Sequence, residues 1–124
     1  MSQTAVGAPS STIRLVQAGA VLSLLVLLWQ FVSAGRLLTG ADALTGHGAG
    51  AIALHVATGL TLVATVLHVR RSAVRWPAVL AAAVFVLTFV QAYLGSSGAI
   101  ATHVPGALAL TVGVVWLAAW AFRR

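Results

Sequence analysis

Cysteine is absent from this 124-residue sequence, and Asp42 is its single acidic residue. Without cysteine the chain can form no disulfide, no iron–sulfur cluster and no thiolate metal site. Without a carboxylate in any long apolar segment, it has no buried Asp or Glu to serve as a general base. Lysine is absent too, so all seven basic residues are arginines. The remaining candidates for chemistry are the four histidines.

Charged residues make up only 6% of the chain, whereas hydrophobic residues make up 60%. A soluble domain of this length could not bury so much apolar surface, so the composition predicts an integral membrane protein. The length allows four spans of about 20 residues each, and no alternating pattern of a β-barrel is present. We therefore expect an all-α integral membrane protein, a four-transmembrane-helix up-down bundle.

The order of apolar and polar segments defines the expected organisation. Residues 1–11 are small and polar and predict a mobile N-terminal tail. Residues 12–124 then form a single transmembrane domain, with spans at about 15–35, 48–69, 76–94 and 100–122. Two parallel helical hairpins result from this order.

The formal net charge of +6 does not indicate nucleic-acid binding, because the arginines lie at the ends of the apolar runs. By the positive-inside rule they predict a multi-pass topology with both termini in the cytoplasm. Arg36 alone falls on the outer side, and the inner side carries Arg14, Arg70, Arg71, Arg75, Arg123 and Arg124. The use of alanine, valine and arginine without lysine is typical of a bacterium, which suggests its plasma membrane.

Histidines within membrane helices indicate a functional site, because a buried imidazole is costly unless it has a partner. We predict that His55 and His103, on the second and fourth spans, bind the iron of a haem b between them. Gly59 and Gly106 follow them by one turn and would leave room for a flat macrocycle. An interhelical hydrogen bond, another metal or a proton relay would also satisfy the two imidazoles.

The other two histidines are weaker candidates. His47 is flanked by glycines at the outer mouth and is expected to be a loop histidine, with ligation as an alternative to His55. His68 lies beside Arg70 and is expected at the membrane interface. Arg36, on the outer side with the expected haem, is a candidate partner for a haem propionate, or it balances Asp42.

Several of these features together resemble one half of a haem A synthase. The first span ends in Gln30 and Gly35, and His55 on the next span is followed by Gly59. The segment FVQAYLG, Phe89–Gly95, is similar to the end of that family's third span. His103 corresponds to the second histidine of such a half. Small four-span bacterial membrane proteins share the same outline.

The resemblance implies haem binding by a histidine pair, but one residue that the family uses for its enzymatic activity differs in this chain. Members of the family carry a glutamate three residues before the second-span histidine, which is implicated in hydroxylation of a haem methyl group. This chain has Ile52 at that position. The substitution argues against oxygenase activity and leaves haem binding untouched.

The expected function is that of a cytochrome b-like protein for electron transfer or haem handling. Two imidazoles give six-coordinate iron with no open site for oxygen. The expected partners in addition to the lipid bilayer are a quinone or a redox protein, with Gln30, Gln91 and Tyr93 lining a polar pocket. The alternatives are a haem-free membrane scaffold or subunit and a haem-modifying enzyme related to haem A synthase.

Overall fold

The computed structural model describes residues 10–70 and 72–123, which form four helices and no strand. The helices are α1 (Ser11–Leu38), α2 (Leu44–Val69), α3 (Trp76–Ser96) and α4 (Ile100–Phe122). Each of them is long and apolar enough to cross a membrane. The prediction of an all-α bundle of four transmembrane helices is therefore confirmed.

The helix bounds differ from the expected spans mainly at the ends of α1 and α2. The first helix begins at Ser11 instead of residue 15, and the side chain of Ser10 caps it by accepting a hydrogen bond of 3.4 Å from the backbone N–H of Ile13. It continues to Leu38, beyond the expected end at residue 35. Most of the tail expected over residues 1–11 lies outside the described residues. The third helix runs two residues further than expected, to Ser96.

The second helix begins at Leu44, four residues before the expected start, so that the glycine-rich segment around His47 is helical. The reason is a close contact with α1. A Cβ atom on Gly50 would lie 2.7 Å from the Trp29 ring and 2.8 Å from the Gln30 side chain. The indole N–H of Trp29 also donates to the carbonyl of Gly46 at 3.0 Å. The glycines at the start of α2 thus let α1 lie against it. The packing of the two helices outweighs the low helix propensity of glycine.

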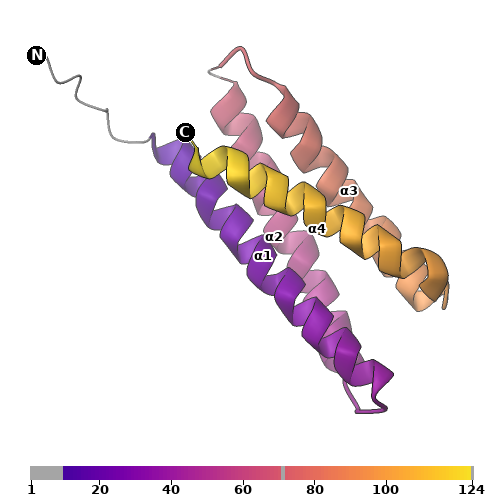
Figure 1. The fold of residues 1–124 in the computed structure, drawn as a ribbon. Coiled ribbons are helices and arrows are strands. Elements are labelled where there is room, and N and C mark those ends of the chain that lie inside the picture. The colour runs from indigo at the N-terminus through magenta and orange to yellow at the C-terminus, as the bar shows by residue number, and fades with distance from the viewer. Residues whose placement is uncertain (1–9, 71, 124) are drawn as a thin grey trace, which may run out of the picture.

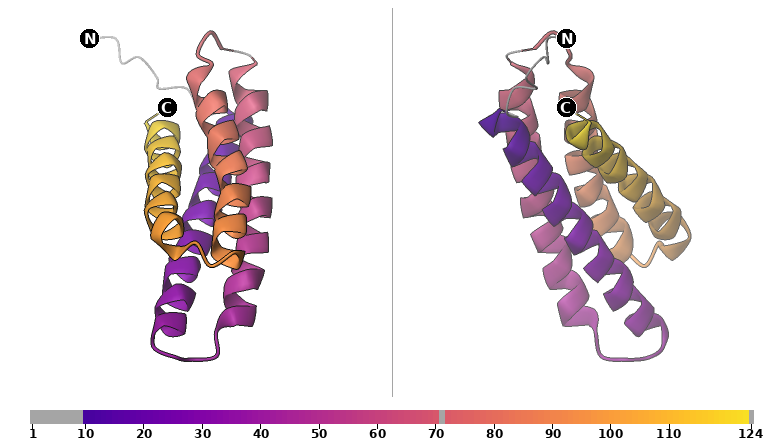
Figure 2. Two further views of the ribbon diagram at one scale, coloured as in Figure 1. Left: turned by 90° about the vertical axis from the view of Figure 1, so that its right-hand side faces the viewer. Right: turned by 60° about the vertical axis from the view of Figure 1, so that its left-hand side comes forward.

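The four helices run alternately up and down (Figure 1). Helices α1 and α3 each pack against both α2 and α4, so α2 and α4 lie diagonally across the bundle. We call the end that carries the helical termini and the α2–α3 connection the terminal end, and the opposite end the distal end. At the distal end the α1–α2 hairpin extends beyond the α3–α4 hairpin (Figure 2).

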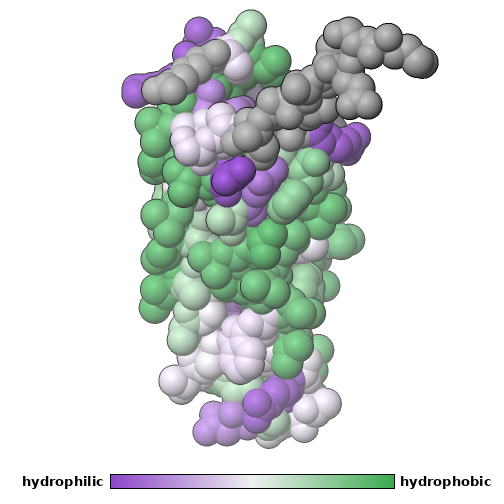
Figure 3. Space-filling model, turned by 90° about the vertical axis from the view of Figure 1, so that its left-hand side faces the viewer, coloured by the Kyte–Doolittle hydropathy of each residue, from purple (hydrophilic) through white to green (hydrophobic). Residues whose placement is uncertain are grey.

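The surface of the bundle fits contact with a lipid bilayer. Large apolar side chains are exposed along all four helices. On the face drawn in Figure 3, apolar residues form a belt between hydrophilic ends. Of the described arginines, only Arg36 lies at the distal end, next to the α1–α2 connection. The chain is therefore a multi-pass membrane protein whose basic residues gather at one end.

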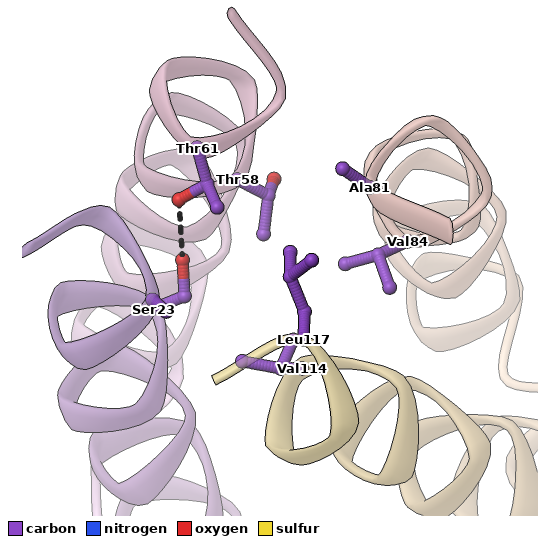
Figure 4. Close-up of a pocket in the computed structure, with 8 residues that line it drawn as sticks. Ser23, Thr58, Thr61, Ala81, Val84, Val114 and Leu117 are labelled. Atoms are coloured by element: carbon purple, nitrogen blue, oxygen red, sulfur yellow. Dashed lines mark hydrogen bonds between the residues drawn. The ribbon is translucent and has the colours of Figure 1, made fainter. Parts of the chain in front are cut away.

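The centre of the bundle is tightly packed. A row of buried hydroxyl groups lies there, and each donates a hydrogen bond to the backbone carbonyl one turn earlier in its own helix. The groups belong to Ser23, Thr58, Thr61 and Thr65. Such bonds satisfy a hydroxyl group without a partner helix. A cavity of only about 10 Å³ lies among these groups, where the hydroxyls of Ser23 and Thr61 are 3.4 Å apart (Figure 4). That volume is close to the minimum for one water molecule.

Candidate functional site

His103 lies in the first turn of α4, and its imidazole packs on the end of α3. Its Nδ1 atom is 3.0 Å from the main-chain carbonyl oxygen of Gln91. A carbonyl can only accept a hydrogen bond, so Nδ1 carries the proton and Nε2 is left with its lone pair. Nε2 has no hydrogen-bond partner among residues 10–70 and 72–123. This is the arrangement of a histidine ligand, whose second nitrogen is held by a protein oxygen.

Gly95 makes this position of the ring possible. A Cβ atom at residue 95 would lie 3.1 Å from Cε1 of His103, which is tighter than nearly all such contacts. The glycine of the FVQAYLG segment therefore gives the imidazole of the next helix a flat surface to lie on. Gly95 precedes the α3–α4 connection and His103 follows it, and the two occur together because the imidazole lies against the glycine.

His47 is anchored to α1 in a comparable way. Its Nδ1 atom is 2.9 Å from the hydroxyl oxygen of Ser33, a residue that is only 1% exposed. With its amide turned so that both ends are satisfied, the Gln30 side chain accepts from the backbone N–H of Ala51. Its NH₂ group donates to the carbonyl of His47 at 3.0 Å and to Nδ1 of His47 at 3.2 Å. His47 therefore belongs to the helical bundle, and the expectation of a loop histidine is wrong.

The structure brings His47 and His103 together, although they come from the diagonal helices α2 and α4. Their ring centroids are 6.5 Å apart, and the two ring planes make an angle of 72°. Two imidazoles that bind one metal ion from opposite sides, with bonds of about 2 Å, place their centroids about 6 Å apart. We call His47 and His103 the distal histidine pair.

His55 makes its contacts with α3. Its Nδ1 atom is 2.8 Å from the hydroxyl oxygen of Thr88, whose own proton goes to the carbonyl of Phe85 at 2.6 Å. The hydroxyl therefore accepts the bond, and His55 also carries its proton on Nδ1. Its ring stacks on Phe89 with centroids 4.2 Å apart and an angle of 13°. Nε2 of His55, like that of His103, has no hydrogen-bond partner in the described part of the chain.

The structure does not bring His55 and His103 into contact. The two rings share no hydrogen bond and no ring contact within the described ranges. His55 follows His47 by eight residues, which places it about 12 Å further from the distal end along the helix axis. Of the two candidates on α2, His47 is the one that lies beside His103.

The glycines that follow the two histidines are used for helix packing. A Cβ atom on Gly59 would lie 3.2 Å from the Phe85 ring, and one on Gly106 would overlap the side-chain amide of Gln91. The space beside both glycines, which was expected to receive a macrocycle, is thus filled by side chains of α3. Small residues at these positions allow helices to approach closely, as in other membrane bundles.

Gln91 is the most unusual polar residue near the distal histidine pair. Its side chain is only 6% exposed, and its Oε1 atom has no hydrogen-bond partner among the described residues. A buried polar atom without a partner points to an unseen donor such as a water molecule or a ligand. Tyr93, expected to share a polar pocket with Gln91, is instead 70% exposed.

The remaining candidate residues lie apart from the distal histidine pair. Arg36 and Asp42 are both exposed and form no ion pair with each other. Arg36 thus remains available at the distal end. His68, in the last turn of α2, bonds to the hydroxyl of Thr12 at 3.0 Å and contacts the Trp120 ring edge-on. These contacts place it at the terminal end of the bundle.

Ser33, the anchor of His47, and Thr88, the anchor of His55, could not be assigned these roles from the sequence. A hydroxyl group inside an apolar span does not by itself indicate a hydrogen bond to a histidine, because most such groups bond within their own helix. The useful signal is a hydroxyl on a neighbouring helix at the same depth as a histidine. Depth can be estimated from the sequence, but the direction in which each side chain points cannot.

Comparison of the chain with known protein families, curated proteins and solved structures found no match. The resemblance to haem A synthase therefore stays a prediction that depends on the residues named above.

Proposed function

We propose that this chain binds one b-type haem through two histidines and serves as an electron carrier in the membrane. The observation that carries the proposal is the distal histidine pair, with ring centroids 6.5 Å apart. A pair of imidazoles is a complete protein ligand set for haem, since the porphyrin supplies the other four nitrogens. A bare zinc ion would need at least three protein ligands.

Three further features support His47 and His103 as the ligands. The Nδ1 atom of each is held by a protein oxygen, which orients the ring as in other metal-binding histidines. Both lie at the distal end, where the α1–α2 hairpin extends beyond the other two helices (Figure 2). The cavity at the centre of the bundle, by contrast, has a volume of only about 10 Å³, close to that of one water molecule. The pair of His55 and His103 has less support, because the ring of His55 is stacked on Phe89.

The surrounding residues have roles that follow from their chemistry. Arg36, exposed and without an ion pair, is suited to a propionate group. When bound, a haem with two imidazole ligands supplies one-electron redox chemistry and leaves no site for oxygen. Oε1 of Gln91, which has no hydrogen-bond partner among the described residues, is suited to accept a hydrogen bond from the hydroxyl group of a quinol. The proposed partner is therefore a quinone or a redox protein.

A haem-modifying enzyme is the less favoured alternative. The position of the family's glutamate is occupied by Ile52, which is 67% exposed on the outer surface of α2. The single carboxylate of the chain, Asp42, lies in the connection before α2 and is exposed. A haem-free scaffold, in which the histidines only join helices, is the other alternative. We further propose a location in a bacterial plasma membrane with both termini in the cytoplasm.

The reduced-minus-oxidised absorption spectrum of protein purified from haem-replete cells tests the proposal. We expect a b-type spectrum from the unchanged chain and its loss in His103→Ala and in His47→Ala. His68→Ala, a substitution at the terminal end, is the matched control and should keep the spectrum. Loss in His55→Ala with retention in His47→Ala would instead assign the second ligand to His55. A colourless unchanged protein would refute haem binding.

A further inference from the structure

The terminal end contains a second cavity that the proposed function does not use. It has a volume of about 390 Å³ and opens between the end of α2 and the start of α3. Its walls are apolar side chains with two arginines among them: Val66, Val69, Arg70, Arg75, Ala78 and Val79. We call it the arginine groove. The distal histidine pair lies at the other end of the bundle, so the two features are independent.

Both arginines of the groove lack an anionic partner in the part of the chain that the structure describes. Arg70 and Arg75 are exposed, and neither side chain forms an ion pair or a hydrogen bond within the described ranges. The single acidic side chain, Asp42, belongs to the opposite end. Guanidinium groups bind phosphate with two parallel hydrogen bonds, so two of them at one cavity suit a phosphate group.

The apolar side of the groove indicates the source of that phosphate. Val66 and Val69 lie in the last turn of α2, and Ala78 and Val79 in the first turn of α3. Val79 is 68% exposed and belongs to the lipid-facing surface of its helix. A ligand in the groove would therefore contact two cations and, directly beside them, the hydrocarbon region. A free phosphate ion has no apolar part that could contact this wall, whereas a phospholipid has acyl chains.

We propose that the arginine groove binds one anionic phospholipid, with its phosphate on Arg70 and Arg75 and an acyl chain along Val79. Basic cavities between helices at a membrane interface are favourable places for anionic headgroups. The lipid would join the ends of α2 and α3 across their connection. The two arginines would attract the negative charge of the headgroup, so a phospholipid without net charge should bind less tightly.

Native mass spectrometry of the detergent-solubilised full chain tests the proposal, with equimolar phosphatidylglycerol and phosphatidylcholine of the same acyl chains. We expect the unchanged protein to retain one phosphatidylglycerol in preference. Because one arginine near the surface accounts for a factor of about five, the double variant Arg70→Gln, Arg75→Gln should lower the ratio of the two bound lipids at least about fivefold. The double variant with lysine at both positions should keep most of the preference.

Arg123→Gln is the matched control, because Arg123 is a basic residue of the terminal end that does not line the groove. If it lowers the lipid ratio as much as the double glutamine variant, general charge explains the preference and the proposal fails. Equal retention of both lipids by the unchanged protein would also overturn it. Displacement of the bound lipid by millimolar glycerol 3-phosphate would show a site for free phosphate esters, and would refute the lipid assignment.

Discussion

His47 and His103 lie with their ring centroids 6.5 Å apart, although they belong to helices on opposite corners of the bundle. The contact is possible because both rings are directed by other helices. Ser33 of α1 holds one, and the main chain of Gln91 in α3 holds the other. All four helices therefore contribute to the geometry of one histidine pair.

Replacing the anchor of His47 should weaken haem binding. Outer-shell partners of ligand histidines typically change affinity by about 10–100-fold, so we expect a loss of this size in Ser33→Ala. Thr88→Val removes the corresponding anchor of His55 and is the matched control, which should leave haem affinity within about twofold of the unchanged chain if His47 is the ligand. Haem titration of the apo-protein, followed by absorbance, measures both variants. The opposite order of effects would favour His55.

The bond between His55 and Thr88 should contribute modestly to stability. Interhelical hydrogen bonds in membrane proteins average about 0.6 kcal/mol, with a maximum near about 1.7 kcal/mol. We expect a coupling free energy in this range from a double-mutant cycle of His55→Leu and Thr88→Val, measured by unfolding in mixed micelles. A coupling near zero would mean that the 2.8 Å contact makes no net contribution.

The close approach of α1 and α2 at Gly19 should be sensitive to a single methyl group. A Cβ atom there would lie 2.5 Å from the hydroxyl oxygen of Thr61 and 3.2 Å from its Cα atom, so the backbones must separate. We expect Gly19→Ala to lower the free energy of unfolding by about 1–3 kcal/mol. Thermal unfolding in detergent measures the change.

Gly48→Ala is the control for this substitution, because a Cβ atom at residue 48 of α2 meets nothing within 4 Å. It should be neutral or stabilising by up to about 1 kcal/mol, since alanine has the higher helix propensity. Equal destabilisation by both substitutions would contradict the packing described for α1 and α2.

The orientation of the bundle can be tested with single cysteines, because the chain has none of its own. Ser72 lies exposed in the α2–α3 connection at the terminal end, and Ser97 lies exposed in the α3–α4 connection at the distal end. With the termini in the cytoplasm, a membrane-impermeant maleimide added to intact cells should label Ser97→Cys and leave Ser72→Cys unlabelled. Both should react after lysis. The reverse pattern in intact cells would invert the topology.

Much of the candidate site could be predicted from the sequence, but its pairing could not. His47, His55 and His103 stand out because imidazoles are rare within apolar spans. The choice of His55 over His47 followed from its deeper position, and the structure instead places His47 beside His103. The start of α2 was the critical uncertainty, since the glycines around His47 are typical of a loop. Only the Trp29 ring packed on Gly50 shows why this segment is helical.

The sequence by itself determined that this is a membrane protein of four helices, the central part of each helix and which end gathers the arginines. These properties depend on the transfer of single side chains between water and lipid, which can be summed along the chain without knowledge of the fold. The tertiary structure decided which polar groups meet. That depends on the rotation of each helix about its axis and its shift along a neighbour, which contacts between distant residues such as Gly19 and Thr61 determine. A rotation of one residue, about 100°, turns a histidine from the bundle interior towards a neighbouring helix or the lipid.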